Sequence, residues 1–255
     1  MNAPIRPFHE NSPREDSPRP RQRLREIGQM LHSHGIFTGG PPEYFEMAGR
    51  LQLATLLREG VYPQSRVLDF GCGCLRGGYW LIHFLDRGRY FGIEPAAFML
   101  RKGIEHVLEP EAWEEKQPRF DTNDRFDFSV FGEKFDVVLA RSIWTHASKA
   151  QVKTMLDGFA ANSSPEAFFL TSYLPARFWT MRTRDYQGDH WIGRSHQSSE
   201  PGLVYHSFRW IKEQVEARGM FVTQLPDLIL NKQHWLRISR VGDQDPRVSH
   251  KFRFA

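Results

Sequence analysis

Short apolar runs and helix-spaced apolar residues take turns along most of this chain. An apolar run between turn residues is typical of a buried strand, whereas apolar positions three and four apart are typical of a helix. The runs predict strands at 67–70, 90–94, 135–140, 168–172, 220–225 and 234–240. The spacing predicts helices at 42–60, 75–85, 97–109, 148–161 and 208–218. Such alternation is typical of an α/β protein whose mostly parallel sheet carries helices on both faces.

Two segments depart from this rhythm. Residues 1–25 hold five prolines and six arginines and few apolar residues, so we expect a flexible arm there. Residues 174–206 are too long for an ordinary connection and are rich in Trp, His, Arg and Tyr. They follow the carboxyl end of a strand, where open α/β sheets bind ligands, and we expect them to form a cap over a substrate.

Composition narrows the class of protein. The 255 residues carry a net charge of +4 without a dense basic block, which permits a polyanionic partner but does not require one. Because no apolar run approaches the ~18 residues of a membrane span and the start lacks an apolar signal core, we expect a cytoplasmic protein without a membrane partner. The two cysteines, Cys72 and Cys74, share one loop and are too few for a disulfide framework or a four-ligand zinc site.

The stretch RVLDFGCGCLRGG, residues 66–78, joins a strand to a helix through a glycine-rich loop. Loops of this kind expose backbone N–H groups to a negative group, either the pyrophosphate of a dinucleotide or the carboxylate of S-adenosylmethionine (SAM). The dinucleotide pattern G-x-G-x-x-G fits Gly71 and Gly73 but fails at Arg76. Glu94, at the end of the next strand, could hold a ribose in either case. Asp69 favours SAM, because its carboxylate can reach an ammonium group through water and NAD has no such group.

The segments VLDFGCGC, YFGIEP and FDVVLA resemble, in order and spacing, the motifs of class I SAM-dependent methyltransferases over residues 61–172. The continuation LRGG resembles a bacterial branch of that family with a GxGxLRGG first motif. Leu75 stands where the family usually has glycine, and we expect Gly77 and Gly78 to provide the close approach of helix to strand while Leu75 points into the core.

The resemblance implies a Rossmann-like, doubly wound fold with a seven-stranded, mostly parallel sheet. The catalytic domain would span 61–255, with an N-terminal helical cap at 26–60 and the substrate cap at 174–206 inserted after the fifth strand. SAM would be the cofactor. The resemblance implies that the methionine end of SAM is bound by Asp69, Gly71, Cys72 and Gly73, and that the ribose is bound by Glu94. It implies that the adenine is contacted by Pro95, by Asp124 or Asp127, and by Phe128. The sulfonium would face the backbone of Ala140.

His146 is the candidate catalytic base. It follows the fourth strand, and its unperturbed pKa of ~6.5 suits removal of a proton from an alcohol or phenol. The alternative is that His146 only orders the turn before Ser148, which begins a capping box with Gln151. Further candidates for substrate contacts or for the base are Trp144, Tyr173, His190, Trp191, His196, Tyr205 and His206.

The expected acceptor is a small molecule, methylated on oxygen without a metal. Enzymes that methylate the exocyclic nitrogens of nucleobases share an Asn/Asp-Pro-Pro-aromatic motif after the fourth strand, and positions 140–143 lack it. Residues 141–146 offer no convergent carboxylates for a metal. The alternatives are methylation of RNA or protein with the basic arm as a docking segment, a non-catalytic subunit with this fold, and a disfavoured NAD oxidoreductase. Nucleic acid is not the expected partner, and the sequence does not indicate an oligomeric state.

Overall fold

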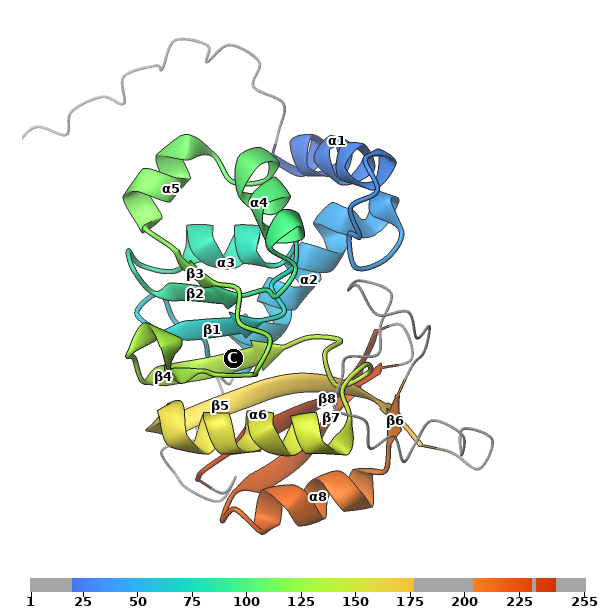
Figure 1. Cartoon of the computed structure of the whole chain (residues 1–255), viewed down its shortest axis with the longest axis vertical. Helices are drawn as coiled ribbons and strands as arrows, with labels where there is room; N and C mark the ends of the chain where they lie inside the picture. The colour runs from blue at the N-terminus through green and yellow to red at the C-terminus, as the bar shows by residue number, and fades with distance from the viewer. Residues whose placement is uncertain (1–19, 177–203, 231–232, 242–255) are drawn as a thin grey trace, which may run out of the picture.

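The computed structural model describes residues 20–176, 204–230 and 233–241. Seven strands form one sheet in the order β3-β2-β1-β4-β5-β8-β7, and an eighth short strand, β6, pairs with the end of β5 (Figure 1). The strands are Val67–Phe70 (β1), Tyr90–Ile93 (β2), Arg119–Asp121 (β3), Phe135–Ala140 (β4), Ser163–Pro175 (β5), Tyr205–His206 (β6), Phe221–Leu230 (β7) and Gln233–Ser239 (β8). Strands β3, β2, β1, β4 and β5 are parallel, whereas β8 runs antiparallel to both of its neighbours. The predicted mostly parallel, seven-stranded path is confirmed.

Helices cover both faces of the sheet (Figure 1). They are Pro20–Ser33 (α1), Phe45–Arg58 (α2), Gly78–Phe84 (α3), Ala97–His106 (α4), Pro110–Lys116 (α5), Lys149–Asn162 (α6) and Phe208–Glu216 (α8), with 3₁₀ turns at Pro42–Tyr44 (η1) and Ser129–Phe131 (η2). Among the described residues, no helix combines the length and apolar character that crossing a membrane requires.

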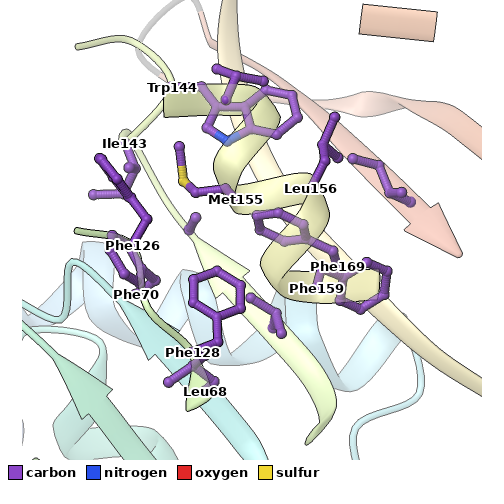
Figure 2. Close-up of a cluster of buried hydrophobic side chains, with 14 of the residues drawn as sticks. Leu68, Phe70, Phe126, Phe128, Ile143, Trp144, Met155, Leu156, Phe159 and Phe169 are labelled. Carbon is purple, nitrogen blue, oxygen red and sulfur yellow. The ribbon is translucent and has the colours of Figure 1, made fainter. Parts of the chain in front are cut away.

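Each face of the sheet has its own apolar core. On one face, Leu68 and Phe70 of β1 meet Met155, Leu156 and Phe159 of α6 (Figure 2). On the other, residues of β1, β4 and β5 pack against α2 and α3; this set includes Val67, Leu139, Leu170, Leu56 and Leu81. Burial on both faces explains why the parallel strands are continuous apolar runs in the sequence.

The ends of the central elements follow local signals. Strands β1 and β4 have the predicted bounds, and the Ser148–Gln151 capping box is confirmed: the Ser148 side chain accepts a hydrogen bond from the Gln151 N–H, and the Gln151 side chain accepts one from the Ser148 N–H. This cap fixes the start of α6 and therefore the length of the β4–α6 connection that reaches the sheet's carboxyl edge.

The N-terminal arm is shorter than predicted. Helix α1 begins at Pro20, so residues 20–25 are helical and only residues 1–19 of the predicted arm lie outside the described part. A proline is tolerated in a first helical turn, and Leu24, Gly28 and Leu31 are the buried residues of α1. The composition of the arm hid this stripe, because charged residues separate its apolar members.

Other bounds also differ. Helix α3 begins at Gly78 rather than at 75, because Leu75 has a left-handed backbone with φ 63°. Pro110 does not simply follow a helix: it occupies the first turn of an additional one, α5. Strand β5 is longer than predicted because Ser163 pairs with Phe135 of β4 at its start and Leu174 and Pro175 pair with β6 at its end. Most of the predicted cap, residues 177–203, lies outside the described residues.

Candidate active site

The loop between β1 and α3, residues 71–77, is here called the glycine loop. Gly71 and Gly73 have φ values of 75° and 60°, a region that L side chains rarely adopt. A Cβ on Gly71 would lie 2.1 Å from Cδ1 of Ile143, which follows β4. The N–H groups of Gly71 and Cys72 both donate to the Ile93 carbonyl of β2. The glycines therefore allow the loop to bend sharply across the carboxyl ends of three neighbouring strands.

Leu75 occupies the position where a glycine was expected, and it adopts glycine's backbone conformation. Its φ is 63°, yet its side chain is fully buried in a cluster with Leu24 and Leu31 of α1 and Leu100 of α4. A left-handed backbone costs an L residue about 1–2 kcal/mol, whereas burying a leucine side chain stabilises by about 1.5–3 kcal/mol. The expectation that Leu75 points into the core is confirmed, and burial offsets the strain.

Gly77 and Gly78 do allow close approaches, though only one of them involves a strand. A Cβ on Gly78 would lie 2.6 Å from the Tyr90 hydroxyl of β2, whereas a Cβ on Gly77 would lie 2.3 Å from Nε2 of Gln52 in α2. Gly49 of α2 likewise sits against the backbone, since its Cβ would lie 2.1 Å from the Arg76 carbonyl oxygen. The glycine loop and the start of α3 are thus packed closely between β2 and α2.

The left-handed backbone of Leu75 leads to a prediction about the relative stabilities of its glycine and alanine variants. We expect both Leu75→Gly and Leu75→Ala to unfold at lower urea concentration than the wild type, because each leaves a cavity costing about 2–5 kcal/mol. The glycine variant should be the more stable of the two by about 1 kcal/mol, because alanine retains the left-handed strain. An alanine variant more stable than the glycine variant would contradict the strain at this position.

Glu94 is held by the backbone on both sides of it. Its Oε2 accepts a hydrogen bond from the Gly73 N–H at 3.0 Å, and its Oε1 accepts one from the Ala96 N–H at 2.9 Å. The residue is buried, and burial raises the pKa of its carboxyl although the two backbone hydrogen bonds oppose the rise. A fixed carboxylate at the end of this strand is a suitable acceptor for the hydroxyl groups of a diol.

Asp69 lies deeper, at the end of β1. Tyr90 donates its hydroxyl hydrogen to Oδ2 of Asp69 at 2.8 Å. Burial raises the pKa of Asp69 to about 7, the Tyr90 hydrogen bond opposes this, and the charge of Glu94 adds to it. A carboxylate poised near neutrality beside the glycine loop ionises fully when a positive group approaches it.

The Asp69 pKa predicts a stability that depends on pH. The pKa rises from 3.8 to about 7 on folding, so the folded state binds the proton more tightly and its stability falls as pH rises through this window. Asp69→Asn keeps an acceptor for Tyr90 without the charge. We expect it to be more stable than the wild type above pH 7, by up to about 4 kcal/mol, with the difference vanishing near pH 4.

Chemical denaturation at a series of pH values measures this difference. The exposed Asp86→Asn variant is the matched control and should follow the wild type at every pH. An Asp69→Asn variant that is less stable than the wild type at pH 8 would mean that the buried charge is compensated in the folded protein.

A cavity opens between the glycine loop, the end of β4 and the N-terminal segment. The described residues that line it are Phe37, Thr38, Gly39, Gln52, Asp69, Gly71, Cys72, Gly73, Cys74, Arg76, Gly77, Glu94, Met99, Arg141, Ser142, Ile143, Thr145, His146 and Gln233. Its wall therefore contains two carboxylates, Asp69 and Glu94, and two guanidinium groups, Arg76 and Arg141. The strands β1, β2 and β4 present their carboxyl ends to this cavity, the edge where ligands bind in open α/β sheets.

The turn after β4 forms the part of the cavity wall beside the glycine loop. Ser142 has a φ of 61°, its N–H donates to the Ser172 hydroxyl, and its own hydroxyl donates to Oε1 of Gln233. Thr145 closes the turn by donating its hydroxyl to the Ser142 carbonyl. A strained backbone held by several hydrogen bonds is a feature that concentrates at functional sites. Here it sets the position of His146 on the cavity wall.

The structure brings together six of the predicted site residues: Asp69, Gly71, Cys72, Gly73, Glu94 and His146. The predicted adenine and sulfonium residues are not among the described residues lining the cavity. Phe128 is buried in the core against Phe70, with ring centroids 5.4 Å apart, so it does not flank a ligand here (Figure 2). Asp127 accepts hydrogen bonds from the N–H and the hydroxyl of Ser129, the first residue of η2. The roles of Pro95, Asp124, Asp127 and Ala140 stay predictions.

The predicted substrate residues are separated by the fold. Trp144 is fully buried against Phe169 of β5 (Figure 2), and Tyr173 donates its hydroxyl to Gln224 of β7. His206 is buried too, and its Nε2 contacts the carbonyl oxygens of Trp144 and Ala147, which points to a structural role in the β4–α6 connection. None of these three lines the cavity. Tyr205 belongs to β6. His190, Trp191 and His196 lie outside the described residues.

Several lining residues carried no motif signal in the sequence. Gln52 comes from α2, Met99 from α4, Arg141 follows β4, and Gln233 begins β8. Gln52 and Arg141 are linked, since Arg141 donates to Oε1 of Gln52 at 3.3 Å. Only the fold brings these elements together, and a spacing rule on one sequence cannot detect them.

The chain has the fold of solved SAM-dependent methyltransferases. Magnesium protoporphyrin IX methyltransferase (ChlM) from Synechocystis PCC 6803, with bound S-adenosylhomocysteine (SAH), matches with a TM-score of 0.58 and 17% identity over 87% of this chain and 98% of its own. DhpI in its SAH complex matches with a TM-score of 0.57 and 13% identity over 86% and 95%. DesVI of Streptomyces venezuelae matches with a TM-score of 0.55 and 14% identity over 78% and 92%. No family model and no curated protein matches the sequence.

Proposed function

We propose that this protein is a metal-independent, SAM-dependent methyltransferase that methylates an oxygen of a small-molecule acceptor. The observation that carries the proposal is the fixed Glu94 carboxylate, tied by Gly73 to the glycine loop and by Ala96 to the following helix. It stands in the same cavity as Asp69 and faces the end of β4. Together these groups suit a ligand with a diol at one end and an ammonium group at the other.

The residues present fit SAM group by group. Glu94 would accept hydrogen bonds from the ribose hydroxyls, and Asp69 would meet the ammonium group. The backbone of Gly71, Cys72 and Gly73 would lie along the amino-acid tail. When bound, SAM supplies a methyl group on a positively charged sulfur. The protein's own contribution is alignment within the cavity, which supplies much of the rate in an in-line displacement.

His146 would act on the acceptor. It lines the cavity in the turn that follows β4, next to Thr145. An imidazole there would take the proton from an acceptor hydroxyl as the oxygen forms its new bond. Ser142 and Thr145 hold the turn that carries it, so the base would be positioned by backbone geometry.

The comparisons support a small acceptor. ChlM is named for magnesium protoporphyrin IX, and a further structure with this fold, from Burkholderia thailandensis, is described as an O-methyltransferase family protein, with a TM-score of 0.54.

Incubation of the protein with methyl-labelled SAM and an extract of its host, followed by fractionation by size, tests the proposal. We expect label in a small-molecule product and a stoichiometric release of SAH. Label recovered only in RNA or protein would shift the acceptor to a macromolecule. Binding of NADH but not SAM in calorimetry would overturn the proposed activity.

A further inference from the structure

Two arginines meet in the cavity wall. Arg76 belongs to the glycine loop and Arg141 directly follows β4, and both line the cavity beside Asp69. Burial lowers the pKa of Arg76, and burial together with the nearby charge of Arg76 lowers the pKa of Arg141 to about 9. The two cations thus repel each other in a partly desolvated site.

Backbone and amide oxygens hold both guanidinium groups by one nitrogen each. Nη1 of Arg76 donates to the carbonyl oxygens of Thr38 and Gly39, at 3.0 and 2.8 Å. Nη1 of Arg141 donates to the Ala48 carbonyl at 2.9 Å and to Gln52 at 3.3 Å. These contacts orient the two groups. The charge of Asp69 acts on both and raises the pKa of each guanidinium, against the effect of burial, so one carboxylate faces two cations here.

The remaining donors form a suitable site for an anion. A guanidinium has five N–H donors in a fixed fork that matches a carboxylate or a phosphate. The fork of Arg76 is packed against Gly39, whose Cβ would lie 2.9 Å from its Cζ, so the N-terminal segment holds this arginine in place. Both arginine side chains are therefore held in place by hydrogen bonds to neighbouring backbone.

The charged groups of SAM indicate that the two arginines bind different ligands. SAM carries one carboxylate, one ammonium group and one sulfonium. Asp69 would pair with the ammonium group, and Arg76, on the glycine loop, would pair with the carboxylate. Arg141 follows β4 and lines the cavity together with His146, and the donor has no second anion for it. A desolvated guanidinium that shares one carboxylate with a second guanidinium is stabilised by a further anion, which the acceptor would supply.

We propose that the methyl acceptor is an acid, carrying a carboxylate or a phosphate-type group that Arg141 binds in the same cavity as His146. This inference rests on the proposed function and adds the substrate class to it. The bound anion would place the acceptor's reactive oxygen between the β4 turn and the glycine loop. Arg141 is therefore the residue that selects acidic acceptors over neutral ones.

The test uses the full chain saturated with SAH, so that the donor site is filled. Inorganic phosphate and acetate are titrated at constant ionic strength and followed by phosphorus and proton NMR. Compared with the wild type, Arg141→Gln should bind both probes at least about tenfold more weakly. Arg141→Lys, which keeps the charge without the fork, should lose less. Arg240→Gln, a change at an exposed arginine, should leave binding unchanged.

A second set of titrations determines whether Arg141 binds an anion of the acceptor or the carboxylate of the donor. SAH and 5′-methylthioadenosine, which lacks the amino-acid tail, are titrated by calorimetry. Arg76→Gln should weaken SAH and leave 5′-methylthioadenosine unchanged, whereas Arg141→Gln should leave both unchanged. Unchanged binding of SAH also shows that the Arg141 variants are folded.

Three results would overturn the proposal. If Arg141→Gln weakens SAH but not 5′-methylthioadenosine, Arg141 serves the donor's carboxylate. If the wild-type SAH complex binds neither probe, or binds both as well after Arg141→Gln as before, no acceptor-anion site exists. If the wild type binds neither SAH nor 5′-methylthioadenosine, the proposed function itself fails, an outcome distinct from the other two.

Discussion

We expect His146→Ala to lower methyl transfer by ~10²–10⁴-fold, the range that a positioned general base contributes. The imidazole lines the cavity on the β4 side, and its loss would leave the acceptor hydroxyl without a base while the donor site stays intact. The measurement is the initial rate of label transfer from methyl-labelled SAM into the small-molecule fraction of one host extract, with the same extract used for every variant.

Two controls distinguish catalysis from folding. His32→Ala changes an exposed histidine of α1 and should retain the full rate. The affinity of His146→Ala for SAH should equal that of the wild type, because the predicted role concerns the acceptor. A His146→Ala variant with the wild-type rate would reduce this residue to ordering the turn before Ser148.

Glu94→Ala should weaken SAH binding by about 10- to 100-fold, which corresponds to about 1–3 kcal/mol in lost charged hydrogen bonds. The change removes the predicted acceptor of the ribose hydroxyls. It also releases the Gly73 and Ala96 N–H groups, so the glycine loop loses one of its anchors. Calorimetry with SAH measures the effect directly.

Glu94→Gln separates these two contributions. Its amide oxygen can still accept one hydrogen bond, so its affinity should fall between those of the wild type and the alanine variant. Glu105→Ala, on the exposed surface of α4, is the matched control and should bind SAH normally. If Glu94→Ala bound SAH like the wild type, Glu94 would have no part in holding the donor.

The fold was predictable where the pattern of apolar residues is decided locally. Strands β1 and β4 are buried on both faces and stand out as uninterrupted apolar runs. The start of α6 was predictable because a capping box is a local contact. The start of α3 was not, because Leu75 takes a left-handed backbone that only its tertiary burial can stabilise. Helix α1 was missed because its apolar stripe lies among arginines.

The candidate site divides in the same way. Asp69, Gly71, Glu94 and His146 lie at the ends of predicted strands, and parallel strands bring such ends to one edge. Arg141 was seen only as part of the turn after β4, because its environment depends on α2, far away in the sequence. Phe128 shows the converse limit: its place after β3 suggested a ring partner for adenine, but its side chain points into the core beside α6.

The crystal structure of the protein with SAH tests the central claim most directly. The account predicts SAH in the cavity between the glycine loop and the end of β4, with both ribose hydroxyls within hydrogen-bonding distance of the Glu94 carboxylate and the amino-acid tail against residues 71–73. A complex in which SAH binds elsewhere, or crystals grown with excess SAH in which this cavity holds only solvent, would contradict it.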